Sequence, residues 1–221
     1  MYTQDCIEIV THCYGKIYTE MLEWQLRSLR AFPTNAYVSV CCSPKDIDTI
    51  AVISKYNAHA VYLEDSYLLR RAHGRNLCAK KTEAQCVWFC DADYVFGEGC
   101  LTSVLAQVDA TSGLCFPSFE YISRDKEIVH NWPIKEEEFI MKRLRFAIGG
   151  AQIVGRDLCH KVGYLDRTDW VKPVDPKKGW YRTKCDYVFR RSLGVKSVPI
   201  DIPNCFRLRH QYVADRKSLS Q

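Results

Sequence analysis

The chain contains 221 residues, 47% of them hydrophobic, and carries a formal net charge of +5. This length and apolar content fit one large globular domain, or one domain with a small appended part. The basic residues are interspersed with acidic ones, which argues against a nucleic-acid-binding surface and fits an anionic ligand at least as well. No apolar run reaches the ~20 residues that a membrane-spanning helix needs.

The twelve cysteines are interpreted as reduced thiols rather than as a disulfide framework. Many lie inside apolar runs, such as residues 40–42, 86–90 and 115–116, where cysteine behaves as a small hydrophobe. The first five residues lack the basic and apolar regions of a signal peptide, and no Cys-x-x-Cys pair supports a thiolate zinc site. We therefore expect an intracellular, cytoplasmic protein in a reducing compartment.

The first 95 residues alternate between two kinds of segment. Apolar runs at residues 6–11, 36–42, 60–63 and 86–90 predict strands, and the segments between them predict helices at about 17–30, 43–56 and 73–84. This order predicts an α/β fold: a single-domain, Rossmann-like sandwich with a mostly parallel central sheet and helices on both faces. No Gly-x-Gly-x-x-Gly follows the first strand, which argues against dinucleotide binding.

The second half has a less regular pattern. It predicts helices at residues 100–108, 136–145, 157–162 and 185–193, and strands at 114–116, 151–154 and 195–200. Residues 168–183 are rich in Pro, Lys, Trp and Tyr without a clear period, so they predict a loop. The polar tail after Val213 has two interpretations: it is disordered, or it marks where a longer natural protein was cut.

Two acids follow the fourth predicted strand, in Asp91-Ala92-Asp93. In an open α/β sheet, ligands bind outside the carboxyl ends of the strands, where these acids are placed. Two neighbouring carboxylates repel each other, and each is costly to bury as an anion. A divalent cation with oxygen ligands resolves that conflict, so the stretch predicts a metal-assisted reaction centre.

Four motifs in the chain resemble elements of family-2 glycosyltransferases, which have the glycosyltransferase A fold. Asp91-Ala92-Asp93 resembles the Asp-x-Asp motif, and Gly74-Arg75-Asn76 resembles the Ala-Arg-Asn element that precedes it. Residues 161–166 resemble the Val-Gly-Phe-Asp-Glu element, and residues 185–194 resemble the helix that carries the catalytic base. The resemblance implies a metal-dependent inverting enzyme that moves a sugar from a nucleoside-diphosphate sugar to an acceptor hydroxyl in glycan synthesis.

The resemblance also implies roles for the acidic residues and a cofactor, Mn²⁺ or Mg²⁺. Asp93 is the preferred direct metal ligand, and Asp91 lies nearer the ribose or acts through metal-bound water. His210 is either a third metal ligand, which would favour Mn²⁺, or a surface histidine beside arginines. Asp186 is the expected general base, and its alternative role is to stabilise the dipole of its helix. A single carboxylate with in-line attack implies inversion at the sugar.

Other residues are candidates for donor and acceptor binding. Arg75 contacts the diphosphate or base, or is a solvated helix charge. We expect the donor beside Thr11, His12, Cys13, Tyr14, Ala92 and Gly150, where Gly149-Gly150 allows close backbone approach or forms an ordinary turn. Trp132, Trp170, Trp180 and Tyr181 are acceptor-site or partly buried aromatics, and Lys177, Lys178 and Arg182 are candidates for a lid over the diphosphate.

These assignments divide the domain into a nucleotide-sugar-binding half at 1–95, an acceptor-binding and catalytic half at 96–213, and a polar tail at 214–221. The partners are a nucleoside-diphosphate sugar and a carbohydrate acceptor, and the chain is also compatible with one domain of a longer enzyme. Departures from the family pattern are Cys185 in place of Glu, Leu77 in place of Gly, and no acid at the end of the second strand. The alternatives are a nucleotidyltransferase acting on sugar phosphates and a non-catalytic nucleotide- or carbohydrate-binding module.

Overall fold

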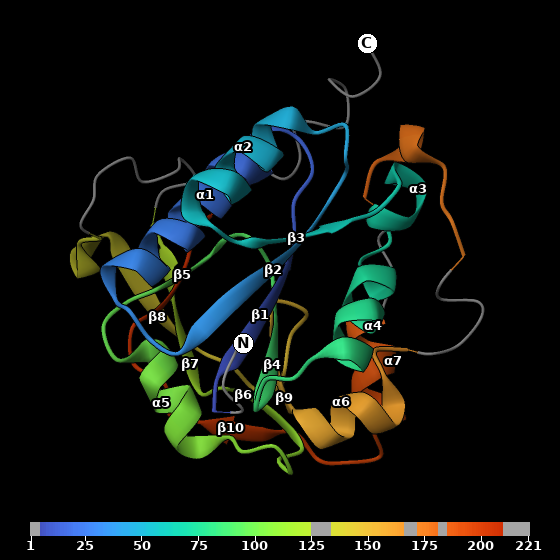
Figure 1. Ribbon diagram of the computed structural model, residues 1–221. Coiled ribbons are helices and arrows are strands. Elements are labelled where there is room, and N and C mark those ends of the chain that lie inside the picture. Colours follow the sequence, from blue (N-terminus) through green and yellow to red (C-terminus); the bar gives the residue numbers. More distant parts are fainter. Residues whose placement is uncertain (1–4, 125–133, 166–171, 181–184, 210–221) are drawn as a thin grey trace.

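The computed structural model of the chain (Figure 1) describes residues 5–124, 134–165, 172–180 and 185–209. Its large sheet contains β1 (Ile7–His12), β2 (Ala36–Cys42), β3 (His59–Tyr62), β4 (Cys86–Cys90), β6 (Leu114–Pro117), β9 (Ala151–Gly155) and β10 (Val198–Ile200). The strand order is β10-β6-β9-β4-β1-β2-β3, and β9 runs antiparallel to both of its neighbours. The prediction of a mostly parallel central sheet is confirmed.

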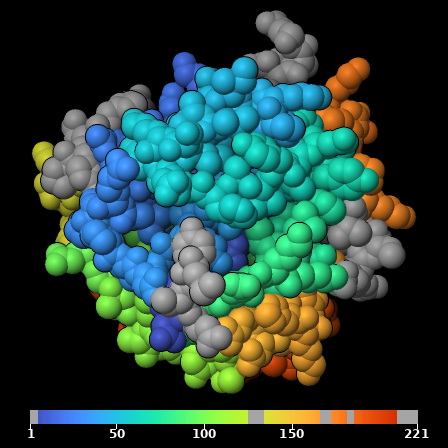
Figure 2. All heavy atoms as spheres, in the orientation of Figure 1, coloured from blue at the N-terminus to red at the C-terminus, as the bar shows by residue number. Residues whose placement is uncertain are grey.

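The helices flank this sheet on both sides. They are α1 (Lys16–Ala31), α2 (Ile47–Tyr56), α3 (Asp65–Leu68), α4 (Arg71–Lys81), α5 (Cys100–Gln107), α6 (Arg156–Val162) and α7 (Cys185–Ser192). Strands β2 and β3 follow β1 toward one edge of the sheet, and β4 lies on the other side of β1. Because crossovers between parallel strands are right-handed, α1 and α2 cover one face of the sheet and α4 covers the other. Figure 1 shows this separation, with α6 and α7 beside α4. In Figure 2, atoms of the N-terminal half, coloured blue to teal, make up most of the visible face.

Strands β1 and β4 are parallel neighbours at the point where the strand order of the sheet reverses. Val10 of β1 pairs with Ser39 of β2 on one side and with Phe89 of β4 on the other. Every residue of β1 and β4 is buried, as expected for parallel strands covered on both faces. Such a topological switch point leaves a crevice at the carboxyl ends of the two strands, which is where α/β proteins bind ligands.

A second, four-stranded sheet packs beside the first. It contains β5 (Tyr94–Phe96), β7 (Phe119–Ser123), β8 (Phe139–Arg143) and β11 (Cys205–Arg207), in the order β5-β11-β7-β8. Apolar side chains of this sheet, among them Phe139 and Phe206, form a small core with Met21 and Trp24 of α1. Its strand β5 begins directly after Asp91-Ala92-Asp93, so this sheet lies along one side of the crevice.

The structure corrects the sequence prediction in the second half of the chain. The helix expected at 136–145 is wrong: residues Glu136–Glu138 form a 3₁₀ turn, and the following residues form β8, which pairs antiparallel with β7. Pairing with a neighbouring strand overrides the polar, helix-like composition of this segment. Strands β5 and β7 and helix α3 were not predicted as separate elements. Helix α4 begins two residues earlier than expected and ends at Lys81, before Thr82 in an extended conformation.

Part of the predicted loop at 168–183 is described, with a 3₁₀ turn at Pro176–Lys178, whereas the polar tail lies outside the described residues. All twelve cysteines are described, free and buried, which confirms their role as small core residues. Within the described part of the chain, no helix has the length and apolar character needed to cross a bilayer. The intracellular, reducing location stays a prediction.

Candidate active site

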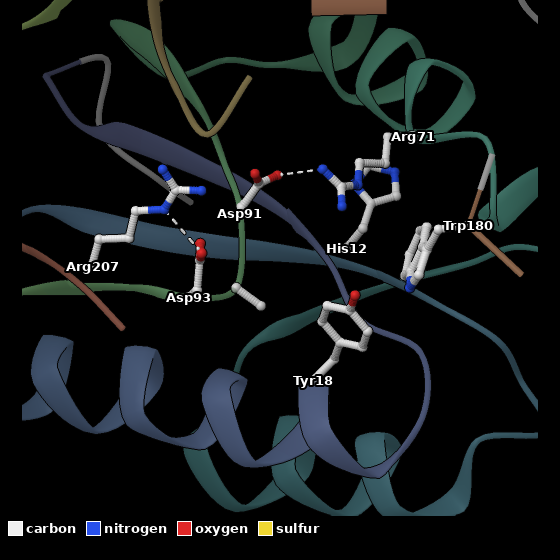
Figure 3. A pocket seen from close by; sticks show the side chains of 8 residues that line it. His12, Tyr18, Arg71, Asp91, Asp93, Trp180 and Arg207 are labelled. Carbon is white, nitrogen blue, oxygen red and sulfur yellow. Dashed lines mark hydrogen bonds and ion pairs between the residues drawn. The ribbon is translucent and has the colours of Figure 1, made fainter. Parts of the chain in front are cut away.

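A cavity of about 230 Å³ opens at the carboxyl ends of β1 and β4, at the switch point of the large sheet. Its lining comes from both sheets, from α1 and α4, and from the segment after the 3₁₀ turn: His12, Tyr18, Arg71, Asp91, Ala92, Asp93, Trp180 and Arg207. Figure 3 shows Arg71 and Arg207 approaching the two aspartates from opposite sides. The acids predicted as the reaction centre therefore face one cavity.

Asp91 is held by two arginines from the same helix. Its Oδ1 accepts hydrogen bonds from Arg71 Nη1 at 3.0 Å and from Arg75 Nη2 at 3.1 Å. Burial opposes ionisation of Asp91, but Arg71, Arg75 and Arg207 together hold the pKa of this carboxyl below its usual value. The other oxygen faces Gly150, where a Cβ atom would lie 3.0 Å from Asp91 Oδ2 and 2.7 Å from Tyr94 Cε2. Gly150 is thus needed so that the chain can pass close behind the carboxylate.

The structure gives Arg75 a different place from the one expected. Its side chain is 1% exposed, lies behind Asp91 and also donates to the Tyr164 hydroxyl at 3.0 Å. Asn76, next in sequence, accepts a hydrogen bond from the Tyr164 backbone N–H at 2.9 Å. Arg75 and Asn76 therefore both contact Tyr164, and Arg75 also holds Asp91 in place. Neither Arg75 nor Asn76 lines the cavity.

Asp93 is the more deeply buried of the two acids. Its Oδ2 accepts a hydrogen bond from Arg207 Nε at 3.0 Å, and its backbone carbonyl accepts one from Leu208 N at 2.7 Å. Arg207 also faces Glu120, with 3.7 Å between Nη1 and Oε1. Strand β11 positions Arg207 because it pairs antiparallel with β5, which opposes Arg207 to Tyr94.

An aromatic wall closes the side of the cavity near His12 and α1. The Trp180 ring makes edge contacts with Tyr18, His12 and Tyr14 at centroid distances of 5.6, 6.4 and 6.5 Å. Arg71 lies over the Trp180 ring, 5.3 Å from its centroid. Burial and the neighbouring Arg75 and Arg71 cations lower the pKa of His12 well below its usual value, so its imidazole is neutral at neutral pH.

The remaining residues predicted after β1 are only partly at the cavity. Thr11 is fully buried, and the Cys13 thiol faces the Thr49 and Thr19 hydroxyls at 3.2 and 3.8 Å rather than the cavity. The Tyr14 hydroxyl donates to Asp65 Oδ2 at 3.4 Å, so this residue borders the cavity through its contact with Trp180. Burial raises the pKa of the Cys13 thiol to about 12, which makes it an inert core thiol.

Asp186 lies on the other side of the Gly149-Gly150 turn from Asp91. A Cβ atom on Gly149 would lie 3.5 Å from Asp186 Cβ and 3.6 Å from its Oδ2. The Asp186 backbone carbonyl accepts a hydrogen bond from Gln152 Nε2 at 3.2 Å, which fixes the start of α7 against β9. The turn therefore brings the expected base close to the cavity, although Asp186 does not line it.

Two half-exposed aromatic residues lie at α7, one on the helix and one beside its Arg190. Phe146 and Tyr187 are 49% and 42% exposed. The Arg190 guanidinium lies 4.5 Å from the Phe146 ring centroid and donates to the Ala147 carbonyl at 3.1 Å. Arg190, which is one helical turn after Asp186 on α7, thereby attaches the segment of Phe146 and Ala147 to this helix.

Some predicted residues fall outside the described ranges, and others are described but do not line the cavity. His210, Trp132, Trp170, Tyr181 and Arg182 lie outside the described residues, and Lys177 and Lys178 are exposed in the 3₁₀ turn. The sequence interpretation did not include Arg71, Tyr18, Glu120 or Arg207. Arg71 was within reach of sequence reasoning, because it is four residues before Arg75 and therefore on the same face of α4.

The donor atoms in the cavity suit a divalent cation that keeps other ligands. Asp91 and Asp93 supply hard carboxylate oxygens, and Mg²⁺-like ions bind one or two carboxylates together with substrate phosphates and water. In the described ranges, no three His, Cys, Asp or Glu side chains gather around one point, so a protein-only cage is not formed there. Arginines bind Asp91 at Oδ1 and Asp93 at Oδ2, so a cation bound by these carboxylates would compete with them for the negative charge.

Comparison with known proteins yields structural relatives only: no family model and no curated protein matches the sequence. The mannosyltransferase PcManGT from Pyrobaculum calidifontis, solved with GDP-Man and Mn²⁺, is 12% identical with a TM-score of 0.53 over 91% of this chain. Residues 1–349 of S. aureus TarS, solved with UDP, are 12% identical with a TM-score of 0.61, also over 91%. The chain spans 56% and 60% of these two chains and 38% of full TarS. The fold is thus the glycosyltransferase A type that the motifs predict.

Proposed function

We propose that the chain is a metal-dependent inverting glycosyltransferase that moves a sugar from a nucleoside-diphosphate sugar to an acceptor hydroxyl. One observation carries the proposal: Asp91 and Asp93 face a single cavity at the switch point of a glycosyltransferase A sheet. The complexes of two proteins of this fold with GDP-Man and Mn²⁺ and with UDP support it. Because the chain spans about 60% or less of those proteins, we also propose that it belongs to a longer enzyme.

The donor half of the site uses the first 95 residues together with Arg207. His12, Tyr18 and Trp180 offer ring surfaces for the nucleoside, and Arg71 and Arg207 offer guanidinium groups for the diphosphate. Asp93 and Asp91 would hold Mn²⁺ or Mg²⁺, which when bound would neutralise the negative charge on the departing diphosphate. Arg75 orients Asp91 from behind and stays out of contact with the donor.

The acceptor half uses residues around the start of α7. Asp186 accepts the proton of the acceptor hydroxyl while the hydroxyl oxygen bonds to the anomeric carbon and the bond to the diphosphate breaks. A single displacement from the face opposite the diphosphate inverts the configuration at that carbon. The exposed rings of Phe146 and Tyr187 suit the apolar face of a sugar ring, which makes them candidates for holding the acceptor.

A screen of nucleotide-sugars tests this proposal. A donor that binds the folded chain raises the unfolding temperature by mass action, and we expect this for at least one UDP- or GDP-sugar with Mn²⁺ present. The stabilising donor should then be transferred or hydrolysed, and EDTA should abolish the reaction. Release of pyrophosphate from a nucleoside triphosphate and a sugar 1-phosphate, with no transfer from any nucleotide-sugar, would favour the nucleotidyltransferase. Binding without turnover would favour the non-catalytic module.

The role of Asp186 is tested with a matched acid. Asp186→Asn should keep donor binding and reduce kcat by at least 10²-fold, the low end of general base catalysis. Asp157, which is also an acid in the first turn of a short helix, is the control, and Asp157→Asn should leave kcat unchanged. Full activity in Asp186→Asn would remove it as the base.

A further inference from the structure

The pairing of Asp93 with Arg207 poses a problem for cation binding. Arg207 Nε donates to Asp93 Oδ2 at 3.0 Å, so the carboxylate proposed to hold the metal is already neutralised by a side chain. A cation that binds Asp93 competes with this guanidinium, which then needs another acceptor. Moving a guanidinium away from a buried counter-charge without a second acceptor would cost several kcal/mol.

Glu120 supplies a second acceptor beside the same guanidinium. It belongs to β7, and its side chain is completely buried. Its Oε2 accepts a hydrogen bond from the Tyr94 hydroxyl at 2.6 Å, which fixes the carboxylate. Its Oε1 lies 3.7 Å from Arg207 Nη1 and 3.8 Å from Lys142 Nζ, and makes no hydrogen bond to any described residue. A buried carboxylate oxygen thus faces Arg207 just beyond hydrogen-bond distance.

Building on the proposed function, we propose that Glu120 is a positioning residue that receives Arg207 when a divalent cation binds Asp93. A small rotation of the guanidinium lengthens its bond to Asp93 and closes the gap to Glu120 Oε1. Each charged group then has an opposite charge beside it, because the cation replaces Arg207 at Asp93 and Glu120 receives Arg207. The exchange moves no proton and breaks no covalent bond.

The same arrangement determines where the Arg207 guanidinium lies after the exchange. Glu120 and Asp93 contact different nitrogens of one guanidinium, so Arg207 stays at the cavity wall after the exchange. There it remains available to an anionic group of a ligand bound beside the cation. Glu120 therefore affects cation affinity without contacting the cation.

The test measures Mn²⁺ binding to the protein without donor, by the electron paramagnetic resonance signal of free Mn²⁺. Glu120→Gln removes the acceptor charge and should raise the Kd for Mn²⁺ about tenfold, since a hydrogen bond to a charged group is typically worth that factor or more. The matched control is Glu8→Gln, which removes another buried carboxylate, one bonded to Ser39 and Tyr37 at the far end of β1. We expect its Kd to stay within twofold of wild type.

A double-mutant cycle separates this role from the general effect of a nearby negative charge. In an Arg207→Met background the competing guanidinium is absent, so Mn²⁺ should bind more tightly and Glu120→Gln should change Kd less than twofold. An equal effect of Glu120→Gln in both backgrounds would overturn the proposal. If the double variant does not fold, Glu120→Asp decides: it keeps the charge but shortens the reach, and an unchanged Kd would refute the role.

The same titration separates this proposal from the proposed function. Wild-type protein that binds no Mn²⁺ would contradict both. Wild-type protein that binds Mn²⁺ with the same Kd as Glu120→Gln would overturn only the role of Glu120. A tenfold loss in Glu120→Gln alone, absent from Glu8→Gln and from the Arg207→Met background, would support it.

Discussion

Two arginines on one face of α4 bind the same oxygen of Asp91, yet we expect different effects when each is replaced by methionine: Arg75→Met should mainly reduce stability and Arg71→Met should mainly reduce nucleotide binding. Arg75 is 1% exposed and donates to Asp91 and to Tyr164. Removing it deletes two hydrogen bonds from a charged donor, each worth about 1.5–3 kcal/mol. Relief of burying the guanidinium offsets part of that loss. We expect Arg75→Met to lower the free energy of unfolding by about 3 kcal/mol.

Arg71 is 27% exposed, lines the cavity and duplicates a contact that Arg75 retains. Arg71→Met should therefore change the free energy of unfolding by less than about 1 kcal/mol, because Arg75 still binds the same oxygen and the Arg71–Asp91 pair is partly open to solvent. It should weaken nucleoside-diphosphate binding at least tenfold, because a guanidinium beside the phosphates is lost.

Urea unfolding followed by circular dichroism measures the stability of both variants, and the slope of each transition checks that the unfolded states are comparable. A thermal-shift titration with UDP and GDP in the presence of Mn²⁺ measures ligand binding. If Arg75→Met kept wild-type stability but lost nucleotide binding, Arg75 would contact the donor directly and the positioning role would be wrong. Equal loss of stability in both variants would contradict the distinction between them.

Gly74, His12 and Phe146 each allow a further test, by stability, by its pH dependence and by acceptor binding. Ala normally stabilises a helix relative to Gly, but Gly74→Ala should lower the free energy of unfolding in urea by about 1–3 kcal/mol, because its Cβ would lie 2.5 Å from His12 Nε2 and 2.6 Å from Cys41 Sγ. The pKa of His12 is lowered in the folded protein, so the stability contributed by its neutral form is complete above pH ~6.5 and is lost as the pH falls toward the folded pKa. The melting temperature of the wild type should therefore fall as the pH is lowered below ~6.5, and that of His12→Gln should fall less. Phe146→Ala should raise the acceptor KM at least fivefold without changing donor binding in steady-state assays, whereas Tyr62→Ala, an exposed aromatic on β3, should change neither.

The sequence predicted the donor edge of the sheet because its signals are local. The unbroken apolar run of β4 and the two acids after it mark a buried strand with a ligand at its end, and that is where Asp91 and Asp93 lie. For Arg75 the sequence left two roles open, a contact to the diphosphate or base and a solvated helix charge, and the buried side chain contradicts the second. Sequence spacing does not show from which side of an acid a neighbouring helix approaches. Only the packing of α4 against the Tyr164 turn decides this.

The other side of the cavity could not be predicted in the same way. Arg207 lies 114 residues after Asp93, and the two strands that bring them together have only three residues each. Such short strands carry almost no periodicity, so their pairing depends on contacts that are distant in sequence. The same reason explains the wrong helix at 136–145, whose residues pair with β7 as an edge strand.

The pairing of β11 with β5 also sets a lower limit on the length of a working donor site. A fragment that ends at residue 95 would contain the whole Asp91-Ala92-Asp93 turn and all of β1 to β4. It would lack Arg207 and the Leu208 N–H that binds the Asp93 carbonyl, and it would cut β5 short and remove its partner strand. Trimming the chain for crystallisation or transplanting the site into another scaffold therefore has to carry residues 205–208 along with the first half.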